Sequence, residues 1–453
     1  MKRFRLLATA LVALLAINYA EAQNHHRRHA AKDYDPSVYL ISVHEVDTFM
    51  TDCDARQQAA MLNRLSAESA VQDYHTTWRQ GHHQVQRPQF VFATRNNRFS
   101  FAMGGAIRLR TTYEFDGIVE NLDFAPKDIP IPGDFNTEQK VSMDASTSYL
   151  FLKAVANTRM GQIVAFVDAD FRGGAEGSYT PRIRQAYFQM WGFTAGRDVT
   201  TFCDIMAAPE TIDYDGPNAY SFRYTTLLRY EHSFFNNRLR VGAAAEIPTI
   251  SATYGDNFAP LNQRMPDFPL YAQFNWGNNL TSHIRASAVL RNMYAYNLKS
   301  ESNTSLLGWG VQASGHIVII KPLELFFSGV YGEGISPYIQ DLKGLGLDFT
   351  PNPAAPTSLQ TMPMYGWQAA LQVNIIPEKL FVSGGYSTVE VCKKNGYFTE
   401  NQYRKGEYIF GNIFYHFAPR MTLAVEYLYG SHKIMSGDKN HANRANLLLE
   451  YKF

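Results

Sequence analysis

Arginine side chains recur at alternate positions of segments whose other positions are apolar. In SFAMGGAIRLRTTYEFDG, Arg108 and Arg110 alternate with Ile107 and Leu109. Successive side chains of a β-strand point to opposite faces, so such a segment has one apolar and one charged face. A guanidinium stays charged and forks onto carboxylates or phosphates, so the chemistry expected here is anion binding. Parity places seven arginines on that face: Arg108, Arg110, Arg223, Arg229, Arg240, Arg285 and Arg291.

Patterns that would support catalysis or metal binding are scarce. The sequence has no G-x-S-x-G and no H-E-x-x-H motif, and His232 beside Ser233 is a chance neighbour at this composition. A hydrolase therefore remains only a minor alternative. Five histidines could hold a metal or belong to a solvated linker, and we favour the linker: His25, His26, His29, His82 and His83. We expect no cofactor and no bound metal.

Charge and cysteine content narrow the partners. Without residues 1–22 the chain has 39 basic and 40 acidic residues, a net charge of −1, which gives no reason to expect nucleic acid. Cys53, Cys203 and Cys392 have spacings that fit no zinc motif. An odd count leaves at least one free thiol, and a Cys53–Cys203 disulfide is an alternative to three isolated cysteines.

From residue 99 onward the apolar period is two, which predicts β-strands. Turn signals such as Asn236-Asn237 mark short connections, whereas 249–266 and 335–362 are long. Short turns at one end and long loops at the other are typical of outer-membrane barrels. Sixteen strands are predicted, at 99–116, 140–157, 160–172, 178–192, 193–202, 222–233, 237–248, 267–277, 280–299, 305–319, 321–334, 363–376, 379–393, 404–418, 420–432 and 441–453.

A soluble β-sandwich or propeller would alternate in the same way. No propeller-type repeat of about 40 to 50 residues is present, and charges recur on one face of strand after strand. A sandwich core cannot absorb unpaired charges, whereas a water-filled lumen can. An open sheet edge is not tolerated in lipid. The predicted fold is therefore all-β: a closed, antiparallel, 16-stranded transmembrane β-barrel over 99–453.

The N-terminal part differs from the barrel. Residues 1–22 have a basic start, an apolar run and an Ala-Glu-Ala end, which is the pattern of a secretory signal peptide. Residues 23–98 are expected to form a short periplasmic extension, disordered at first and partly helical over 54–79.

Residues 181–224, PRIRQAYFQMWGFTAGRDVTTFCDIMAAPETIDYDGPNAYSFRY, resemble the DcaP-like trimeric porins and, more distantly, the phosphate-selective porins. GGAIRLRTTYEFDG is similar to the first barrel strand of that family. The terminal Phe453 matches the aromatic C-terminus that the barrel assembly machinery reads. The matching positions in 181–224 are Arg184, Ala186, Tyr187, Gly196, Thr200, Phe202, Thr211, Asp213, Gly216, Pro217 and Asn218.

The resemblance implies a homotrimeric channel in the outer membrane of a Gram-negative bacterium, in contact with lipid and open to small, usually anionic, hydrophilic solutes. It also implies that a loop at about 203–221 folds into the lumen, with Asp213 and Asp215 opposite the arginines. The aspartates could instead only cap their own turns. The arginines could likewise only pair with lumen acids. A structural or adhesion barrel with its function in the loops is the alternative to a porin.

Arg182 and Arg184 are also expected to face the lumen, although their strand alternates poorly. Gln185 has the same parity as Ile183, so neither face of this strand is uniformly apolar. A strand that packs against other subunits escapes the requirement for an apolar lipid-facing side. We therefore assign 181–192 to the trimer interface.

Overall fold

The computed structural model describes residues 39–42, 81–84, 90–93, 98–118, 123–175 and 177–453. The predicted signal peptide and the predicted helix over 54–79 lie outside these ranges. Within the described ranges, no helix is both long and apolar enough to cross a membrane.

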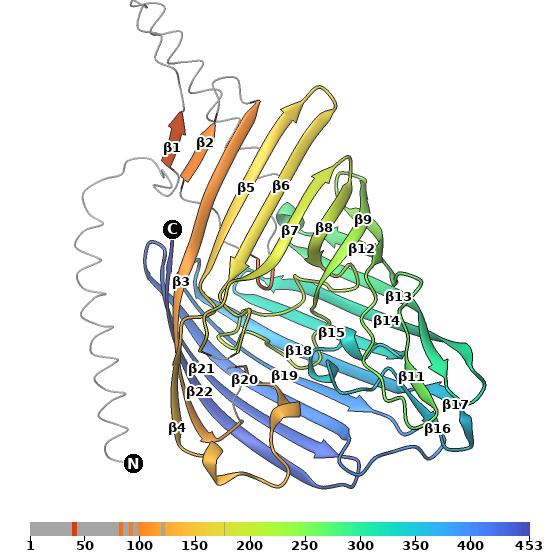
Figure 1. Cartoon of the computed structure of the whole chain (residues 1–453). Coiled ribbons are helices and arrows are strands. Elements are labelled where there is room, and N and C mark those ends of the chain that lie inside the picture. Colours follow the sequence, from red (N-terminus) through yellow and green to blue (C-terminus); the bar gives the residue numbers. More distant parts are fainter. Residues whose placement is uncertain (1–38, 43–80, 85–89, 94–97, 119–122, 176) are drawn as a thin grey trace, which may run out of the picture. The chain divides into compact units, whose positions relative to one another are not determined.

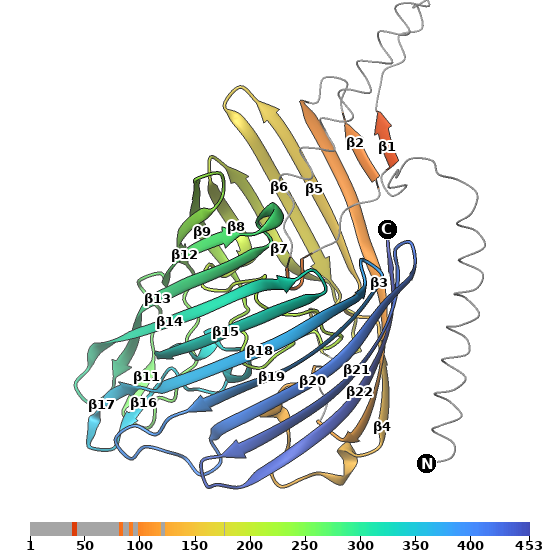
Figure 2. The same ribbon diagram turned by 180° about the vertical axis from the view of Figure 1, so that it is seen from behind.

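Sixteen antiparallel strands form one closed sheet, seen from two sides in Figures 1 and 2. Each strand pairs with the next, and β22 pairs with β3 to close the ring. This confirms the predicted 16-stranded barrel. The strands are β3 (Phe99–Asp116), β5 (Tyr149–Thr158), β6 (Gly161–Asp170), β7 (Arg182–Met190), β8 (Phe193–Val199), β9 (Tyr224–Phe234), β10 (Leu239–Glu246), β12 (Phe268–Trp276), β13 (Ser282–Asn297), β14 (Ser302–Ile320), β15 (Leu323–Glu333), β18 (Pro363–Ile376), β19 (Leu380–Val391), β20 (Tyr403–Ala418), β21 (Met421–Ile434) and β22 (Lys439–Lys452).

Shorter elements extend this ring. The strands β4 and β2 pair with β3, β11 pairs with β13, and β16 and β17 form a separate hairpin. The bounds are β1 (Tyr39–Ser42), β2 (Phe90–Ala93), β4 (Lys140–Asp144), β11 (Phe258–Pro260), β16 (Phe349–Asn352) and β17 (Ala355–Thr361). Single 3₁₀ turns are η1 (Pro126–Asp128), η2 (Phe135–Thr137), η3 (Asn278–Leu280), η4 (Ser336–Tyr338) and η5 (Gln340–Leu342).

The two faces of the strands have opposite chemistry. On β3 the apolar Ile107 and Leu109 are 60% and 43% exposed, whereas the polar Arg110 and Thr112 are 1% and 3% exposed. This is the reverse of a soluble protein, in which large apolar side chains are mostly buried. The exposed apolar residues form the outer surface that contacts lipid, and the polar residues line the lumen.

One predicted strand is two strands in the structure. The predicted range 140–157 contains β4 and β5, separated by a turn at 145–148. The carboxylate of Asp144 accepts hydrogen bonds from the backbone N–H and the hydroxyl of Ser146, both at 3.0 Å, and so turns the chain.

The barrel has a turn end, where short turns such as 159–160 and 191–192 join the strands, and a loop end with long connections. In outer-membrane barrels the short turns face the periplasm. The chain also ends here. The N–H and C=O of Phe453 exchange hydrogen bonds with Gly105, each 2.9 Å long, which seals the β22–β3 seam. On the other edge of β3, a Cβ on Gly105 would lie 2.4 Å from the carbonyl oxygen of Tyr149 in β5, so glycine is required between β5 and β22.

Candidate functional site

Three loops return from the loop end into the barrel. We call them inward loop 1 (residues 123–139), inward loop 2 (200–223) and inward loop 3 (334–362). Phe202 of loop 2 and Tyr338 and Leu342 of loop 3 are 0% exposed and pack in one apolar cluster. Connecting segments usually lie on the surface, because their backbone groups need water. Here the wall of the barrel supplies the hydrogen-bond partners instead.

Inward loop 2 crosses the lumen. It leaves β8, and its Ile212 and Asp213 N–H groups donate to the carboxylate of Glu426 on β21 at 3.0 and 2.8 Å. The N–H of Ala219 donates to the Ser387 hydroxyl on β19 at 3.0 Å. The strands β8 and β19–β21 lie on opposite sides of the closed ring. The loop therefore spans the lumen and narrows it.

Asp213 of inward loop 2 is buried at a junction with inward loop 1. It accepts the N–H of Phe124 at 3.0 Å and the hydroxyl of Tyr408 on β20 at 3.1 Å. Burial, together with the nearby charges of Asp123 and Glu426, raises the pKa of Asp213 to about 7. Its carboxylate thus bonds to other elements of the fold, and only 1% of the residue is exposed.

Asp341 of inward loop 3 joins all three loops. Its carboxylate accepts the N–H of Lys127 in loop 1 at 3.0 Å and the side-chain amide of Asn218 in loop 2 at 3.2 Å. It also accepts the hydroxyl of Tyr403 on β20. Burial raises the pKa of Asp341 and of the half-buried Asp215, and for Asp215 the charge of Asp123 is the second cause.

Most of the predicted arginines lie on the lumen side in ion pairs. Arg291 is fully buried and contacts Asp267 and Asp348 at 3.1 and 3.0 Å. Taking one partner away from such a pair leaves an uncompensated buried charge, so the loss of either partner destabilises the wall. The other pairs are Arg108 with Glu450 (3.2 Å), Arg110 with Asp144 (3.7 Å), Arg182 with Asp170 (2.5 Å), Arg184 with Asp168 (2.6 Å) and Arg229 with Asp198 (2.6 Å).

The remaining predicted arginines have weaker or neutral partners. Arg223 donates to the hydroxyls of Thr225 and Thr249, both at 3.3 Å. The guanidinium of Arg285 lies 3.6 Å from the centre of the Tyr271 ring. Arg240 is the most exposed, with 45% of its side chain accessible and its nearest carboxylate, that of Glu231, 3.9 Å away.

The irregular alternation of β7 has a local cause. The register between β6 and β7 shifts at Asp168, which pairs with Gln185 while the next residue pairs with Ile183. This β-bulge adds one residue to β7, so that both Arg184 and Gln185 turn inward. Arg184 is 2% exposed and Gln185 is 0% exposed, whereas Ile183 is 53% exposed on the outer face. The bulge explains the broken parity without a subunit contact.

Two polar cavities lie in the turn-end part of the lumen. The larger, of about 550 Å³, is lined by Arg229, Arg240 and Arg285 together with Glu231 and other polar side chains. The smaller, of about 280 Å³, is lined by Arg108, Arg184, Glu210, Glu450 and Lys452. Arginines from the alternating pattern therefore face both open spaces.

Residues 81–84 lie between these two cavities, and Gln84 lines both. The N–H of His82 donates to the carbonyl oxygen of Ile205 in inward loop 2 at 2.7 Å. Within the described parts of the chain no group of three or more His, Cys, Asp or Glu residues could hold a metal ion. Cys203 is buried and Cys392 half-buried, and both are free thiols.

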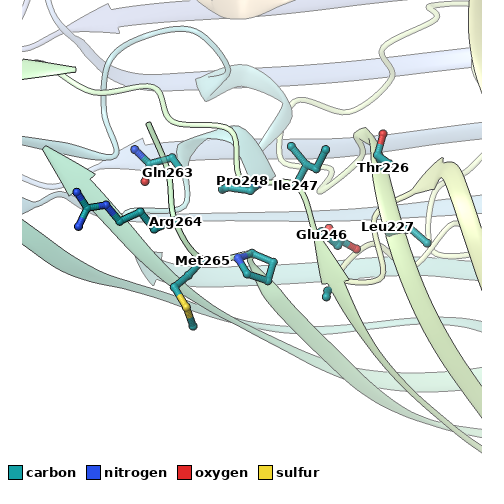
Figure 3. A pocket seen from close by; sticks show the side chains of 10 residues that line it. Thr226, Leu227, Glu246, Ile247, Pro248, Gln263, Arg264 and Met265 are labelled. Carbon is teal, nitrogen blue, oxygen red and sulfur yellow. The ribbon is translucent and has the colours of Figure 1, made fainter. Parts of the chain in front are cut away.

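A third hollow, of about 340 Å³, lies at the loop ends of β9 and β10 (Figure 3). Its lining includes Glu246, which points inward and is 1% exposed, and Ile247 and Met265, which are 57% and 43% exposed. The exposed apolar side chains place this hollow on the outer surface. It is therefore distinct from the lumen cavities.

Residues 92–257, which include β3–β10 and inward loops 1 and 2, match the family model of the DcaP outer membrane protein. Over these residues the chain is similar to the DcaP family. The match and the closed barrel identify a β-barrel of the bacterial outer membrane, of the porin type, as the sequence predicted. The chain matches none of the curated proteins with which it was compared.

Solved structures show the same fold. The outer membrane channel DcaP of Acinetobacter baumannii is 19% identical to this chain, with a TM-score of 0.68 over 78% of this chain and 97% of that one. OmpT of Vibrio cholerae, in its trimer form, is 12% identical, with a TM-score of 0.50 over 78% and 99%.

The predicted set of pore-lining residues was incomplete. Arg172 contacts Asp123 and lies 4.4 Å from the centre of the Tyr214 ring, next to Asp213 and Asp215. Arg172 has the same parity as Asp168 and Asp170, and this alternation alone places it on the charged face. Inward loops 1 and 3 gave no comparable signal, because long polar connections are equally expected to extend away from the barrel.

Proposed function

We propose that this chain is a passive pore for small hydrophilic solutes that favours anions bearing a carboxylate or phosphate. The observation that carries the proposal is the 550 Å³ lumen cavity lined by Arg229, Arg240 and Arg285. Arg240 is half exposed and only loosely paired, so its charge acts on solutes in the cavity rather than on a buried partner. Arg285 adds a further positive charge to the cavity wall, where its guanidinium donates to the hydroxyl of Ser287 at 3.1 Å and to the carbonyl oxygen of Thr201.

Selectivity is tested by single-channel recording in planar lipid under a KCl gradient. We expect a reversal potential that indicates anion preference, and a smaller preference in Arg240→Gln and Arg285→Gln. Arg159→Gln, in the exposed β5–β6 turn, removes the same charge outside the cavity and is expected to leave the preference unchanged. Cation selectivity would overturn the proposed role of the arginines but not the proposed pore. A complete lack of current would favour a structural or adhesion barrel.

Solute preference is tested by swelling of proteoliposomes. Anionic, neutral and cationic solutes of equal size separate charge from size. We expect the anionic solute to enter fastest. Equal rates for all three solutes would leave a channel without the proposed preference.

We also propose a homotrimer with contacts on the outer face of β7 and β8. Ile183, Phe188 and Trp191 there are 53%, 54% and 61% exposed and apolar. Residues of this kind suit either lipid or a subunit contact. Light scattering in detergent measures the oligomeric state, and Phe188→Glu is expected to reduce the trimer fraction. A wild-type monomer would overturn this part of the proposal.

A further inference from the structure

The segment Gly81–Gln84 forms a tight turn inside the lumen. The N–H of Gln84 donates to the carbonyl oxygen of Gly81 at 3.1 Å, and the N–H of His82 donates to the carbonyl oxygen of Ile205 at 2.7 Å. The second bond joins residues more than a hundred positions apart in the chain. The turn is thus held by inward loop 2, the loop that spans the lumen.

Both histidine rings of this turn pack against aromatic residues of inward loop 2. The ring of His83 stacks on Tyr214, with 3.9 Å between centroids. The ring of His82 meets Tyr220 and Phe222 edge-on, at 5.1 and 5.4 Å. Aromatic pairs in such geometries contribute beyond the apolar area that they bury. The aromatic side chains of inward loop 2 therefore form the binding surface for the two histidine rings.

Gly81 fits this surface closely. Its φ is +126°, and a Cβ built on it would lie 2.5 Å from the carbonyl oxygen of Ile205. Any other residue would be strained in this conformation and would also collide with backbone. Only glycine therefore fits against inward loop 2 at position 81.

The turn occupies space that would otherwise be open. Gln84 lines both the 550 Å³ and the 280 Å³ cavity, and Gly81, His82 and His83 line the smaller one. The turn thus separates two polar spaces in the turn-end part of the lumen.

We propose that residues 81–84 are a plug that narrows or closes the pore from its turn end, seated on inward loop 2 and released when His82 and His83 become protonated. This rests on the proposed function as a pore. The segment precedes β2 and β3 in the chain, so it can leave the lumen without breaking any pairing of the barrel strands.

The charged side chains around His82 and His83 disfavour protonation of the two rings. Arg108 of β3, Arg184 of β7, Lys452 of β22 and Lys343 of inward loop 3 are cationic, and Glu210 of inward loop 2 and Glu450 of β22 are anionic. Glu450 is already paired with Arg108 and Lys452, at 3.2 and 3.0 Å. Arg184 is likewise paired, with Asp168 at 2.6 Å, so the positive charges that act on His82 are those of Arg108 and Lys343.

The pKa of His82 is lowered to about 3, mainly by burial and next by the positive charges of Arg108 and Lys343. Burial, with His82, Arg184 and Arg108, lowers the pKa of His83 well below its usual value. In the released segment both pKa values return to about 6.5. Acid therefore favours release, and at pH 5 His82 alone weakens the seated state about 30-fold relative to pH 8.

The experiment is single-channel recording of the full-length wild type between pH 8 and pH 5, with Gly81→Ala alongside. We expect the wild type to show a low conductance or open fraction at pH 8 that rises below about pH 6.5. Gly81→Ala is expected to be open at both pH values. Gly437→Ala is the matched control, because Gly437 has a φ of +108° and nothing within 4 Å of its Cβ position.

The double variant His82→Gln/His83→Gln tests the protonation step. It keeps polar side chains of similar size but takes up no proton, so we expect the pH dependence to disappear. Equal, pH-independent conductance of the wild type and Gly81→Ala would overturn the plug and leave the pore intact. A rise on acidification that persists in the double variant would overturn the role of the histidines. No current in any variant would overturn the pore itself, and the plug with it.

Discussion

Replacing Arg291 by Met tests whether the lumen arginines act as structural ties. The guanidinium of Arg291 contacts Asp267 and Asp348 and donates to the carbonyl oxygen of Gly334 at 2.6 Å. Met fills similar space but leaves both carboxylates buried without their cation. Breaking a buried pair in this way costs about 3–5 kcal/mol. Because Gly334 and Asp348 belong to inward loop 3, the loss should also loosen that loop.

The measurement is the free energy of unfolding in urea of the refolded barrel, with Arg240→Met as the matched control. Arg240 faces the lumen too, but 45% of its side chain is exposed and its carboxylate partner is 3.9 Å away. Such a pair contributes about 0–1 kcal/mol.

A third variant, Arg291→Met/Asp348→Asn, removes one of the orphaned charges and should recover part of the loss. If Arg291→Met costs no more than Arg240→Met, the reasoning from burial is wrong. If the second substitution recovers nothing, the loss does not come from the uncompensated carboxylate.

Three further predictions use other parts of the lumen. The pKa of Asp213 is raised to about 7, so its folded state holds a proton that the unfolded state releases above about pH 4. Stability should therefore fall as pH rises from about 4 to about 7, with a shallower slope in Asp213→Asn measured by urea unfolding at each pH. Burial raises the pKa of the Cys203 thiol to about 12, so maleimide should label it only after unfolding, as mass spectrometry would show. Leu448→Ala should cost about 2–5 kcal/mol because Leu448 is 2% exposed in an apolar cluster, whereas Leu449→Ala on the 43% exposed outer face should cost much less. Equal losses for the two leucines would contradict the assignment of their faces.

The barrel could be predicted from the sequence because each strand carries its own signal. The period of two and the turn residues are local, and β3 and β18 have the predicted bounds, 99–116 and 363–376. The errors arose where a side chain or a bulge changed the backbone locally. Asp144 ends β4 within a predicted continuous strand, and the bulge at Arg184 shifts the parity of β7.

The interior could be predicted only in part, because it depends on which segments meet across the lumen. Parity placed Arg110 and Arg291 inward, but nothing in the sequence pairs Arg291 with Asp348, 57 residues further along. The contact between His82 and Ile205 is equally non-local. Long-range partners of this kind follow from how loops close inside the barrel rather than from any local preference.

Leu448 departs from the alternation of outward apolar and inward polar residues in β22, and this departure marks a loop contact inside the barrel. In β22 it is an apolar residue among the lumen-facing polar ones, between Asn446 and Glu450. It packs in a buried cluster with Ile212 of inward loop 2 and with Phe381, Phe414 and Ala424 of the wall. A lumen filled with water would disfavour this side chain, so its position marks where a loop covers the wall. Apolar residues at inward positions of neighbouring strands therefore indicate the part of the wall on which an inward loop is seated.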